Sequence, residues 1–274
     1  MAIKSIQQDQ PSMAAAFQSP SALQPPLPDP QFLYYSRQLL LPDWSEQRQV
    51  QLSRSKVLIV GIGGLGCPAA TYLAGAGVGW MVLADGDQVE QSNLPRQTLF
   101  RLSDLGLNKA EAAAASLKQL NPFIRIDTIP HQLDEAELAR RIAWADLVLD
   151  CSDNLATKLA INRLCQQQQR CWIGASASGY QGYSWLIQPG NGGCLSCLGH
   201  QSPLAAGGCL QQGIYSPLVG QLGLQQASLA LQQLTMARQR PSFMQIYQHH
   251  QQQFSQCQLL ADPRCECCGV TTDV

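Results

Sequence analysis

The feature that most constrains the fold is a glycine-rich turn between a short apolar run at 56–60 and an alanine-rich helical run at 68–76. A turn in this position directs backbone N–H groups and a helix N-terminus at a phosphate, and glycine is needed because a Cβ atom would block the approach. Asp85 ends the next apolar run, about 20 residues on, where a carboxylate binds ribose hydroxyls. The pattern predicts a nucleotide site, and the alternative is a tight turn without a ligand. The glycines are Gly61, Gly63, Gly64 and Gly66.

Strand-like and helix-like segments alternate along the first part of the chain. This alternation is typical of βαβ units and predicts an α/β fold with a doubly wound, mainly parallel sheet, covered by helices on both faces. The pattern of the second part of the chain predicts a β extension, a Gly- and Cys-rich loop, a long helix and a hairpin. Strands are expected at 56–60, 80–84, 124–129, 147–150, 171–175, 182–188, 243–248 and 254–259. Helices are expected at 68–76, 109–120, 134–143, 154–168 and 217–238, with one or two more within 31–54.

The domain organisation follows from length and composition. The 274 residues suffice for two domains or one large α/β domain, and we expect one. Residues 1–30 are rich in Gln, Pro, Ser and Ala and predict a disordered tail. Residues 31–274 are expected to form the domain. Its nucleotide-binding part spans about 31–175, and its crossover loop, long helix and C-terminal part span about 176–274.

Charge and apolar patterning exclude several classes of function. A formal net charge of −1 excludes the positive field of a dedicated nucleic-acid binder. No apolar run approaches the length of a membrane span, and the N-terminal residues lack the apolar core of a signal peptide. We therefore expect a cytoplasmic protein without a membrane or nucleic-acid partner. Its 11 cysteines are expected to be reduced.

Polar side chains lie at the expected carboxyl ends of the strands, which in a doubly wound sheet surround one crevice. Two cations, an amide and a carboxylate are a poor set for hydride transfer. They suit phosphoryl chemistry, in which Arg and Lys neutralise developing charge and Asp binds Mg²⁺. A nicotinamide oxidoreductase stays a rival, because it would share the glycine turn and Asp85. The residues concerned are Ser92, Asn93, Arg96, Lys109, Asp153 and Asn154.

Two Cys-x-x-Cys pairs can supply the four thiolates of a tetrahedral structural zinc site. Such a closed site would tie the end of the chain to the body of the domain and serve folding rather than catalysis. Reduced free thiols and a redox pair are the alternatives, and Cys267 is a competing ligand by position. The first pair is Cys194 and Cys197, and the second is Cys265 and Cys268. Core positions are expected for Cys67, Cys151, Cys165 and Cys171.

Six motifs occur in order along the chain: Tyr35-Ser36-Arg37-Gln38, the turn at 61–66, Asp85-Gly86-Asp87, Ser92-Asn93-Leu94-x-Arg96-Gln97, Lys109, and Asp150-Cys151-Ser152-Asp153-Asn154. In this combination the chain resembles the ThiF/MoeB/HesA group, relatives of ubiquitin-activating enzymes, from about residue 34 to 269. The resemblance implies binding of ATP and Mg²⁺. It implies adenylation of the C-terminal glycine carboxylate of a small ubiquitin-fold protein, with release of pyrophosphate. It also implies zinc on the two cysteine pairs.

The resemblance implies roles for the polar residues as well. The glycines cradle the nucleotide, Asp85 holds the ribose and Asp153 positions Mg²⁺. Arg37 reaches the ATP site of the neighbouring subunit in a homodimer. The partner's carboxylate is already a nucleophile at pH 7, so the reaction needs alignment and charge neutralisation rather than a general base. Phosphate contacts are implied for Arg37, Asn93, Arg96 and Lys109, and further nucleotide contacts are expected at Asp87, Ser92 and Asn154.

Two positions bear on the details of the reaction. In such proteins a cysteine in the loop that holds Cys209 takes part in thioester or sulfur-transfer steps, and the alternative is an idle thiol. Pro95 stands where the group usually has glutamine, and proline supplies neither an amide side chain nor a backbone N–H. The expected function is adenylation of a ThiS/MoaD-like sulfur carrier ending in Gly-Gly, which prepares it for a separate sulfur donor. Adenylation of a ribosomal peptide and a non-catalytic scaffold are the alternatives.

Overall fold

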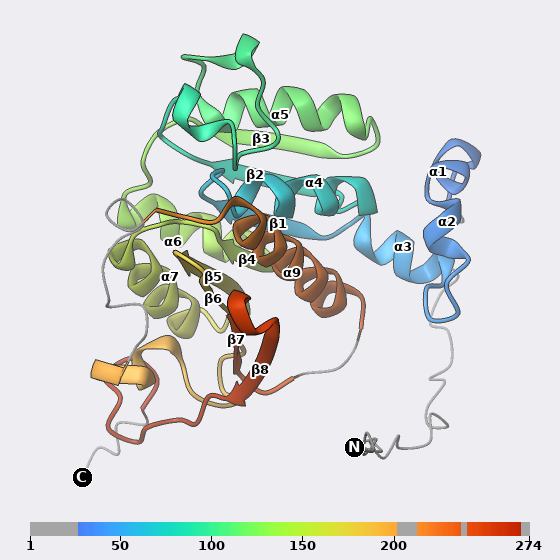
Figure 1. Cartoon of the computed structure of the whole chain (residues 1–274). Coiled ribbons are helices and arrows are strands. Elements are labelled where there is room, and N and C mark those ends of the chain that lie inside the picture. Colours follow the sequence, from blue (N-terminus) through green and yellow to red (C-terminus); the bar gives the residue numbers. More distant parts are fainter. Residues whose placement is uncertain (1–26, 202–212, 237–239, 270–274) are drawn as a thin grey trace, which may run out of the picture.

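One eight-stranded sheet organises the chain, in the order β3-β2-β1-β4-β5-β6-β7-β8 (Figure 1). The structure is a computed structural model, and it describes residues 27–201, 213–236 and 240–269. Strands β1 to β5 pair in parallel, and β6, β7 and β8 extend the sheet antiparallel. The predicted α/β class and mainly parallel sheet are confirmed. The strands are β1 Lys56–Val60, β2 Trp80–Ala84, β3 Arg125–Ile129, β4 Leu147–Asp150, β5 Trp172–Ser178, β6 Gln181–Ile187, β7 Phe243–Gln248 and β8 Gln253–Gln258.

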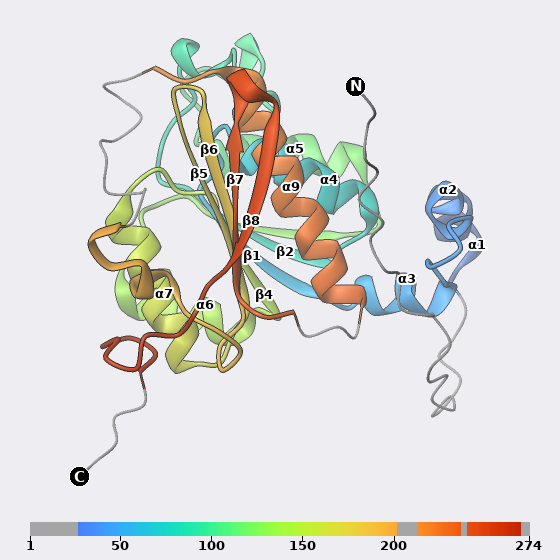
Figure 2. The same cartoon turned by 60° about the horizontal axis from the view of Figure 1, so that its bottom comes forward.

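Helices cover both faces of the sheet. Figure 2 shows the sheet nearly edge-on, with α4, α5 and α9 on one side and α6 and α7 on the other. Helices α1 and α2 stand beside the sheet and are joined to it through α3. The bounds are α1 Asp29–Tyr34, α2 Ser36–Leu39, α3 Glu46–Leu52, α4 Gly66–Ala76, α5 Lys109–Leu120, α6 Glu135–Trp144, α7 Leu155–Gln167 and α9 Ser216–Thr235.

The core has two layers because successive residues of a strand face opposite sides. On β1, Val57 and Ile59 pack with the α4, α5 and α9 layer, whereas Leu58 packs with the α6 and α7 layer. The four cysteines expected in the core are buried, as predicted, and burial raises the pKa of Cys67 and of Cys171 to about 12. These thiols are therefore packing groups rather than nucleophiles.

Polar side chains fix where the helices of the nucleotide half begin. The Asn108 side chain accepts hydrogen bonds from the first turn of α5, and the Asp134 side chain does the same for α6. The Asn154 side chain accepts from the backbone N–H of Thr157 at 2.8 Å and begins α7. Since each cap follows a strand or loop, the helices start at the carboxyl edge of the parallel strands.

The N-terminal region differs from its prediction. One or two helices were expected within 31–54, but the structure has three short ones, separated by Tyr35 and a turn before Ser45. Tyr35 is buried, and its hydroxyl accepts a hydrogen bond from Asn121. The expected tail ended at residue 30, yet α1 already begins at Asp29, and the structure does not describe residues 1–26. In the described residues, no helix is long and apolar enough to span a membrane.

Candidate functional site

A cavity of about 300 Å³ lies at the carboxyl ends of β1, β2 and β4. This is the crevice where a doubly wound sheet holds its ligands. Residues after β3, on α6 and on α7 complete its wall, among them His131, Glu135 and Thr157. The structure brings five of the predicted site residues to its lining: Gly61, Asp85, Asp87, Asp153 and Asn154.

The glycine turn at the cavity is built by close backbone approaches. Gly61 has a φ of +90°, a conformation that L side chains rarely adopt, and a Cβ atom there would lie 2.7 Å from the Cys151 carbonyl oxygen. A Cβ on Gly66 would meet the Gly61 carbonyl oxygen. Gly63 differs, since its Cβ would meet only the Gln97 amide nitrogen at 3.6 Å. Gly61 and Gly66 are thus required by the fold, whereas Gly63 has open space beside it.

Asp85 is held by the backbone of the same turn. Its carboxylate accepts hydrogen bonds from the backbone N–H groups of Ile62 at 2.6 Å and Asp87 at 2.9 Å. Burial raises the pKa of Asp85 above its ordinary value, although these two N–H groups oppose the shift. The carboxylate is therefore fixed at the mouth of the glycine turn, where sequence predicted a ribose contact.

Lys109 is the buried cation of the site. Its ammonium lies 2.8 Å from the Asp87 carboxylate, and its side chain is 9% exposed against 60% for that of Asp87. The backbone of Lys109 also donates to the Asp87 carbonyl oxygen. Asn108 donates to the Asp85 carbonyl oxygen at 2.9 Å, which ties the start of α5 to the end of β2. Lys109 thus adjoins the cavity through Asp87, which is part of its lining.

The segment from Ser92 to Gln97 runs behind the glycine turn. Arg96 donates to the Ser92 carbonyl oxygen at 2.9 Å, and Pro95 is exposed beside it. Asn93 and Gln97 are buried, and the amide oxygen of each has no hydrogen-bond partner within the described part of the chain. Of these groups, the Gln97 amide nitrogen lies on the open side of Gly63. Ser92, Asn93 and Arg96 do not line the cavity itself.

Asp153 projects from the loop between β4 and α7. Its carboxylate is exposed to the cavity and has no hydrogen-bond or ion-pair partner among the residues that the structure places. Asn154, predicted as a nucleotide contact, uses its side-chain oxygen to cap α7. Behind the loop lies a buried ion pair between Asp150 and Lys158, at 3.1 Å. Sequence reasoning missed Lys158, because a lysine on a helix is usually a solvated charge.

Arg37 lies outside this assembly. It is exposed on α2, and Figures 1 and 2 place α2 well away from the loop that precedes α7. Cys209, the other predicted catalytic residue, lies outside the described residues. Gly64 faces α9, since a Cβ there would lie 2.6 Å from a Val219 methyl group. The predicted set therefore divides into a cavity group, a group behind the turn and a remote arginine.

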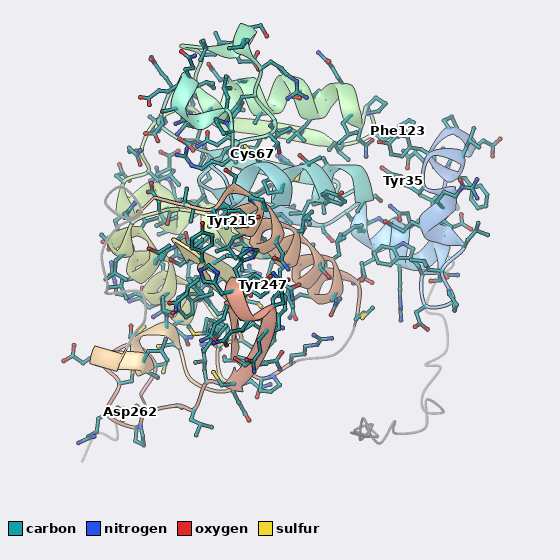
Figure 3. The ribbon with its side chains drawn as sticks, in the orientation of Figure 1. Tyr35, Cys67, Phe123, Tyr215, Tyr247 and Asp262 are labelled. Atoms are coloured by element: carbon teal, nitrogen blue, oxygen red, sulfur yellow. The ribbon has the colours of Figure 1, made fainter. Side chains whose placement is uncertain are left out.

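The four predicted zinc ligands form one cluster beside Asn162, near the middle of α7. The sulfur atoms of Cys194, Cys197, Cys265 and Cys268 all lie within 4.8 Å of one another. Neighbouring sulfurs are 3.7 Å apart between Cys194 and Cys265, 3.9 Å between Cys194 and Cys197, and 3.3 Å between Cys197 and Cys268. Figure 3 labels Asp262 on the C-terminal segment, and its backbone N–H points at the Cys197 sulfur at 3.5 Å.

Cys267, the competing ligand by position, is not part of the four-sulfur cluster. Its sulfur accepts a hydrogen bond from the Asn162 amide at 3.1 Å. The same amide nitrogen lies 3.5 Å from the Cys194 sulfur, and the Asn162 oxygen accepts from the Leu195 N–H at 3.0 Å. Asn162 is buried on α7 and thus fastens the cysteine loops to the helix that begins at the cavity.

The fold and the cavity define the class: a doubly wound α/β protein with a nucleotide-type crevice at its strand ends. Within that class the chain belongs to the ThiF family, whose model matches residues 35–269. It is 39% identical over 242 residues to the sulfur carrier protein ThiS adenylyltransferase of Escherichia coli K12, covering 88% of this chain and 96% of the relative. It is 38% identical over 245 residues to the molybdopterin-synthase adenylyltransferase of the same bacterium, covering 89% and 98%.

A solved structure shares the architecture. The crystal structure of E. coli MccB with ATP superposes with a TM-score of 0.76, at 24% identity, covering 86% of this chain and 73% of MccB. Identity at this level shows the common fold alone. The resemblance drawn from the sequence motifs is confirmed.

Proposed function

We propose that the protein uses ATP to adenylate the C-terminal carboxylate of a small ubiquitin-fold sulfur carrier. Its two E. coli relatives are named for the same kind of reaction, on ThiS and on molybdopterin synthase. The observation that carries the proposal is the cavity at the strand ends. There an anchored carboxylate, Asp85, and one without a partner among the described residues, Asp153, line the same cavity as Gly61, and the buried cation Lys109 adjoins it through Asp87.

The residues of the chain would act by binding and orientation. The carrier's carboxylate oxygen attacks the α-phosphorus of ATP, a new C(O)O–P bond forms, and the bond to the β-phosphate oxygen breaks to release pyrophosphate. The attacking group is already ionised, so no proton has to move. Asp85 would hold the ribose, and the turn around Gly63 would receive phosphate oxygens. Lys109 and Arg96 would neutralise the charge that develops on the leaving pyrophosphate.

A magnesium site fits Asp153. Its carboxylate is exposed to the cavity and free of partners among the described residues, and oxygen ligands are those that Mg²⁺ prefers. When bound with ATP, the ion supplies charge screening for the phosphates. Asp153 would hold it at the wall of the cavity.

A structural zinc fits the cysteine cluster. In a tetrahedral site with Zn–S bonds of about 2.3 Å, the sulfurs stand about 3.8 Å apart. The observed spacings of 3.3, 3.7 and 3.9 Å match that geometry without a disulfide. The ion would link η3 (Leu195–Gln201) and the Cys194 loop to the C-terminal segment. Ten described free cysteines also suit a reducing compartment such as the cytoplasm.

The partners belong to the same proposal. A homodimer would give Arg37 an ATP site to reach. Helix α1 and the residue that follows α2 carry exposed apolar side chains of the kind that mark an interface: Phe32 at 50%, Leu33 at 76% and Leu40 at 73% exposure. The carrier adenylate would then pass to a separate sulfur donor. Whether Cys209 accepts the carrier as a thioester is a separate prediction, which a Cys209→Ser variant would answer by losing sulfur transfer but not adenylation.

The test is ATP–pyrophosphate exchange with a purified carrier protein that ends in Gly-Gly. Wild-type protein should catalyse exchange only when the carrier is present, and Asp153→Ala should lower the rate by about 10²-fold or more without unfolding the chain. Exchange with a ribosomal peptide but with no carrier would replace the proposed substrate. No exchange with any candidate would leave a scaffold of the same fold.

Arg37 is tested by mixing two inactive variants. In a mixed dimer of Arg37→Ala and Asp153→Ala chains, one of the two sites would hold both intact residues. Random mixing should therefore restore up to about a quarter of the wild-type rate. If the mixture stays inactive while each variant still dimerises, Arg37 does not act across the interface.

A further inference from the structure

Beneath the loop that carries Asp153 lies a buried ion pair that the cavity does not expose. Asp150 is fully buried and Lys158 is 3% exposed, and neither residue lines the cavity. A buried charge is costly unless it is paired and its hydrogen-bonding groups are satisfied. The hydrogen bonds of this ion pair therefore show which part of the loop it holds in place.

Lys158 is satisfied by three acceptors from three places. Its ammonium donates to the Asp150 carboxylate at 3.1 Å, to the Ser152 carbonyl oxygen at 2.8 Å and to the Ala175 carbonyl oxygen at 2.9 Å. An ammonium has three donors, so all of them are used. One bond reaches the end of β4, one reaches the peptide bond that precedes Asp153, and one reaches β5.

Asp150 holds the same loop from the other side. Its second carboxylate oxygen accepts from the Ser152 backbone N–H at 3.0 Å and from the Ser152 hydroxyl at 2.6 Å. Ser152 is therefore gripped through its N–H, its hydroxyl and its carbonyl by one ion pair. Since Asp153 follows directly, this grip sets the direction in which its carboxylate leaves the loop.

We propose that Lys158 is a positioning residue for Asp153, which fixes the loop so that the Asp153 carboxylate meets Mg·ATP. The charges support the same role. Lys158 cancels the charge of Asp150, and the loop is left with the single negative charge that Asp153 presents to the cavity. The chemistry of the step rests on the proposed function, but the role of Lys158 is measured by binding.

The experiment is a cycle of Mg·ATP affinities measured by isothermal titration calorimetry on the full chain. Lys158→Met is combined with Asp150→Asn, because this pair of changes leaves no unpaired buried charge. The double variant is made in the wild-type background and again in the Asp153→Ala background. Thermal unfolding of each protein is followed by circular dichroism, and Lys158→Arg serves as the conservative control.

If Lys158 acts through Asp153, the double variant should bind Mg·ATP at least about tenfold more weakly than wild type, while its affinity for ATP in EDTA changes less than twofold. In the Asp153→Ala background the same changes should have no further effect on Mg·ATP binding. Lys158→Arg should stay within about threefold of wild type. A purely structural role predicts instead an equal loss in both backgrounds and with or without Mg²⁺.

A folded double variant with wild-type Mg·ATP affinity, or equal losses in both backgrounds, overturns the proposal. If the double variant does not fold, Lys158→Gln, which keeps a donor for Ser152, decides it by the same comparison with and without Mg²⁺. Wild-type protein that binds Mg·ATP but exchanges no pyrophosphate refutes the proposed adenylation and leaves Lys158 its role. Wild-type protein that binds no Mg·ATP refutes both.

Discussion

The cavity lies at the first turns of α7, the cysteine cluster lies further along the same helix beside Asn162, and the two sites are built in opposite ways. Cavity side chains are held by the protein itself, as Asp85 is by the Ile62 N–H and Asn154 by the Thr157 N–H. The four sulfurs of the cluster mostly face one another, and they join segments 71 residues apart. The first site is a product of the fold, whereas the second contributes to holding the fold. Changes in the two should therefore affect different measurements.

The largest effect is expected from Cys265→Ser. Loss of one thiolate should reduce bound zinc from about one equivalent to near none and lower the free energy of unfolding by about 3 kcal/mol, or roughly 6–12 °C in Tm. Metal analysis and thermal unfolding measure the two quantities. The matched control is Cys267→Ser, two residues along and outside the four-sulfur cluster, which should keep the metal. Equal metal loss in both variants would contradict the assignment of ligands.

Lys109→Ala should act on chemistry rather than on the fold. Removal of the buried cation beside Asp87 should lower the kcat/KM of pyrophosphate exchange by about 10²-fold, because charge on the phosphates is no longer neutralised. Lys118→Ala, at the exposed end of the same helix, is the control and should leave exchange unchanged. If the two variants behave alike, Lys109 is only a helix-end charge.

Gly63→Ala separates ligand contact from folding within one turn. A Cβ at Gly63 meets only the Gln97 amide nitrogen at 3.6 Å, so the variant should fold with an unchanged Tm. It should raise the KM for ATP by about tenfold, because the methyl group occupies space that phosphate needs. Gly66→Ala is its counterpart, since its Cβ would meet the Gly61 carbonyl oxygen and should destabilise the chain itself.

The smallest effect is a pH dependence of ATP binding. Burial raises the pKa of Asp85, so as pH falls this carboxyl protonates before an ordinary aspartate does. Protonation removes an acceptor for ribose hydroxyls, so the KM for ATP should rise a few-fold towards acid pH, and Asp85→Asn should abolish that rise. A raised pKa in the folded state also means that proton uptake by Asp85 favours folding, so acid unfolding through this group cannot explain the change.

The sequence predicted the parallel half of the sheet closely. Strands β1, β2 and β4 begin and end where their apolar runs do, because a strand buried on both faces is apolar throughout. Strand β5 was expected to end at 175 but continues to Ser178, since it pairs antiparallel with β6 as far as Gln181. That pairing is a contact between two strands, and the residues of β5 alone do not predict where it ends.

The same limit applies to the candidate site. Motifs brought Asp85, Asp87 and Asp153 to one cavity, because strand ends meet at one edge of a parallel sheet. Lys158 was missed, although it lies one helical turn after Asn154, because its burial depends on Asp150 and Ala175 meeting it in three dimensions. The sequence pointed to the four cysteines through their Cys-x-x-Cys spacing, and the structure brings their sulfurs within 4.8 Å of one another; that they bind zinc stays a prediction.

With a metal bound, the cysteine cluster would transmit force directly between the C-terminal segment and the Cys194–Cys197 loop. Tension applied to the C-terminal segment would pass through the Cys265 and Cys268 sulfurs to Cys194 and Cys197, and from there through Asn162 into α7. Helix α9 and the β7–β8 hairpin lie within the closed ring of chain and would bear no load until the site ruptured. In a chelator, the same pull in an optical trap would first strip β8 from the exposed edge of the sheet.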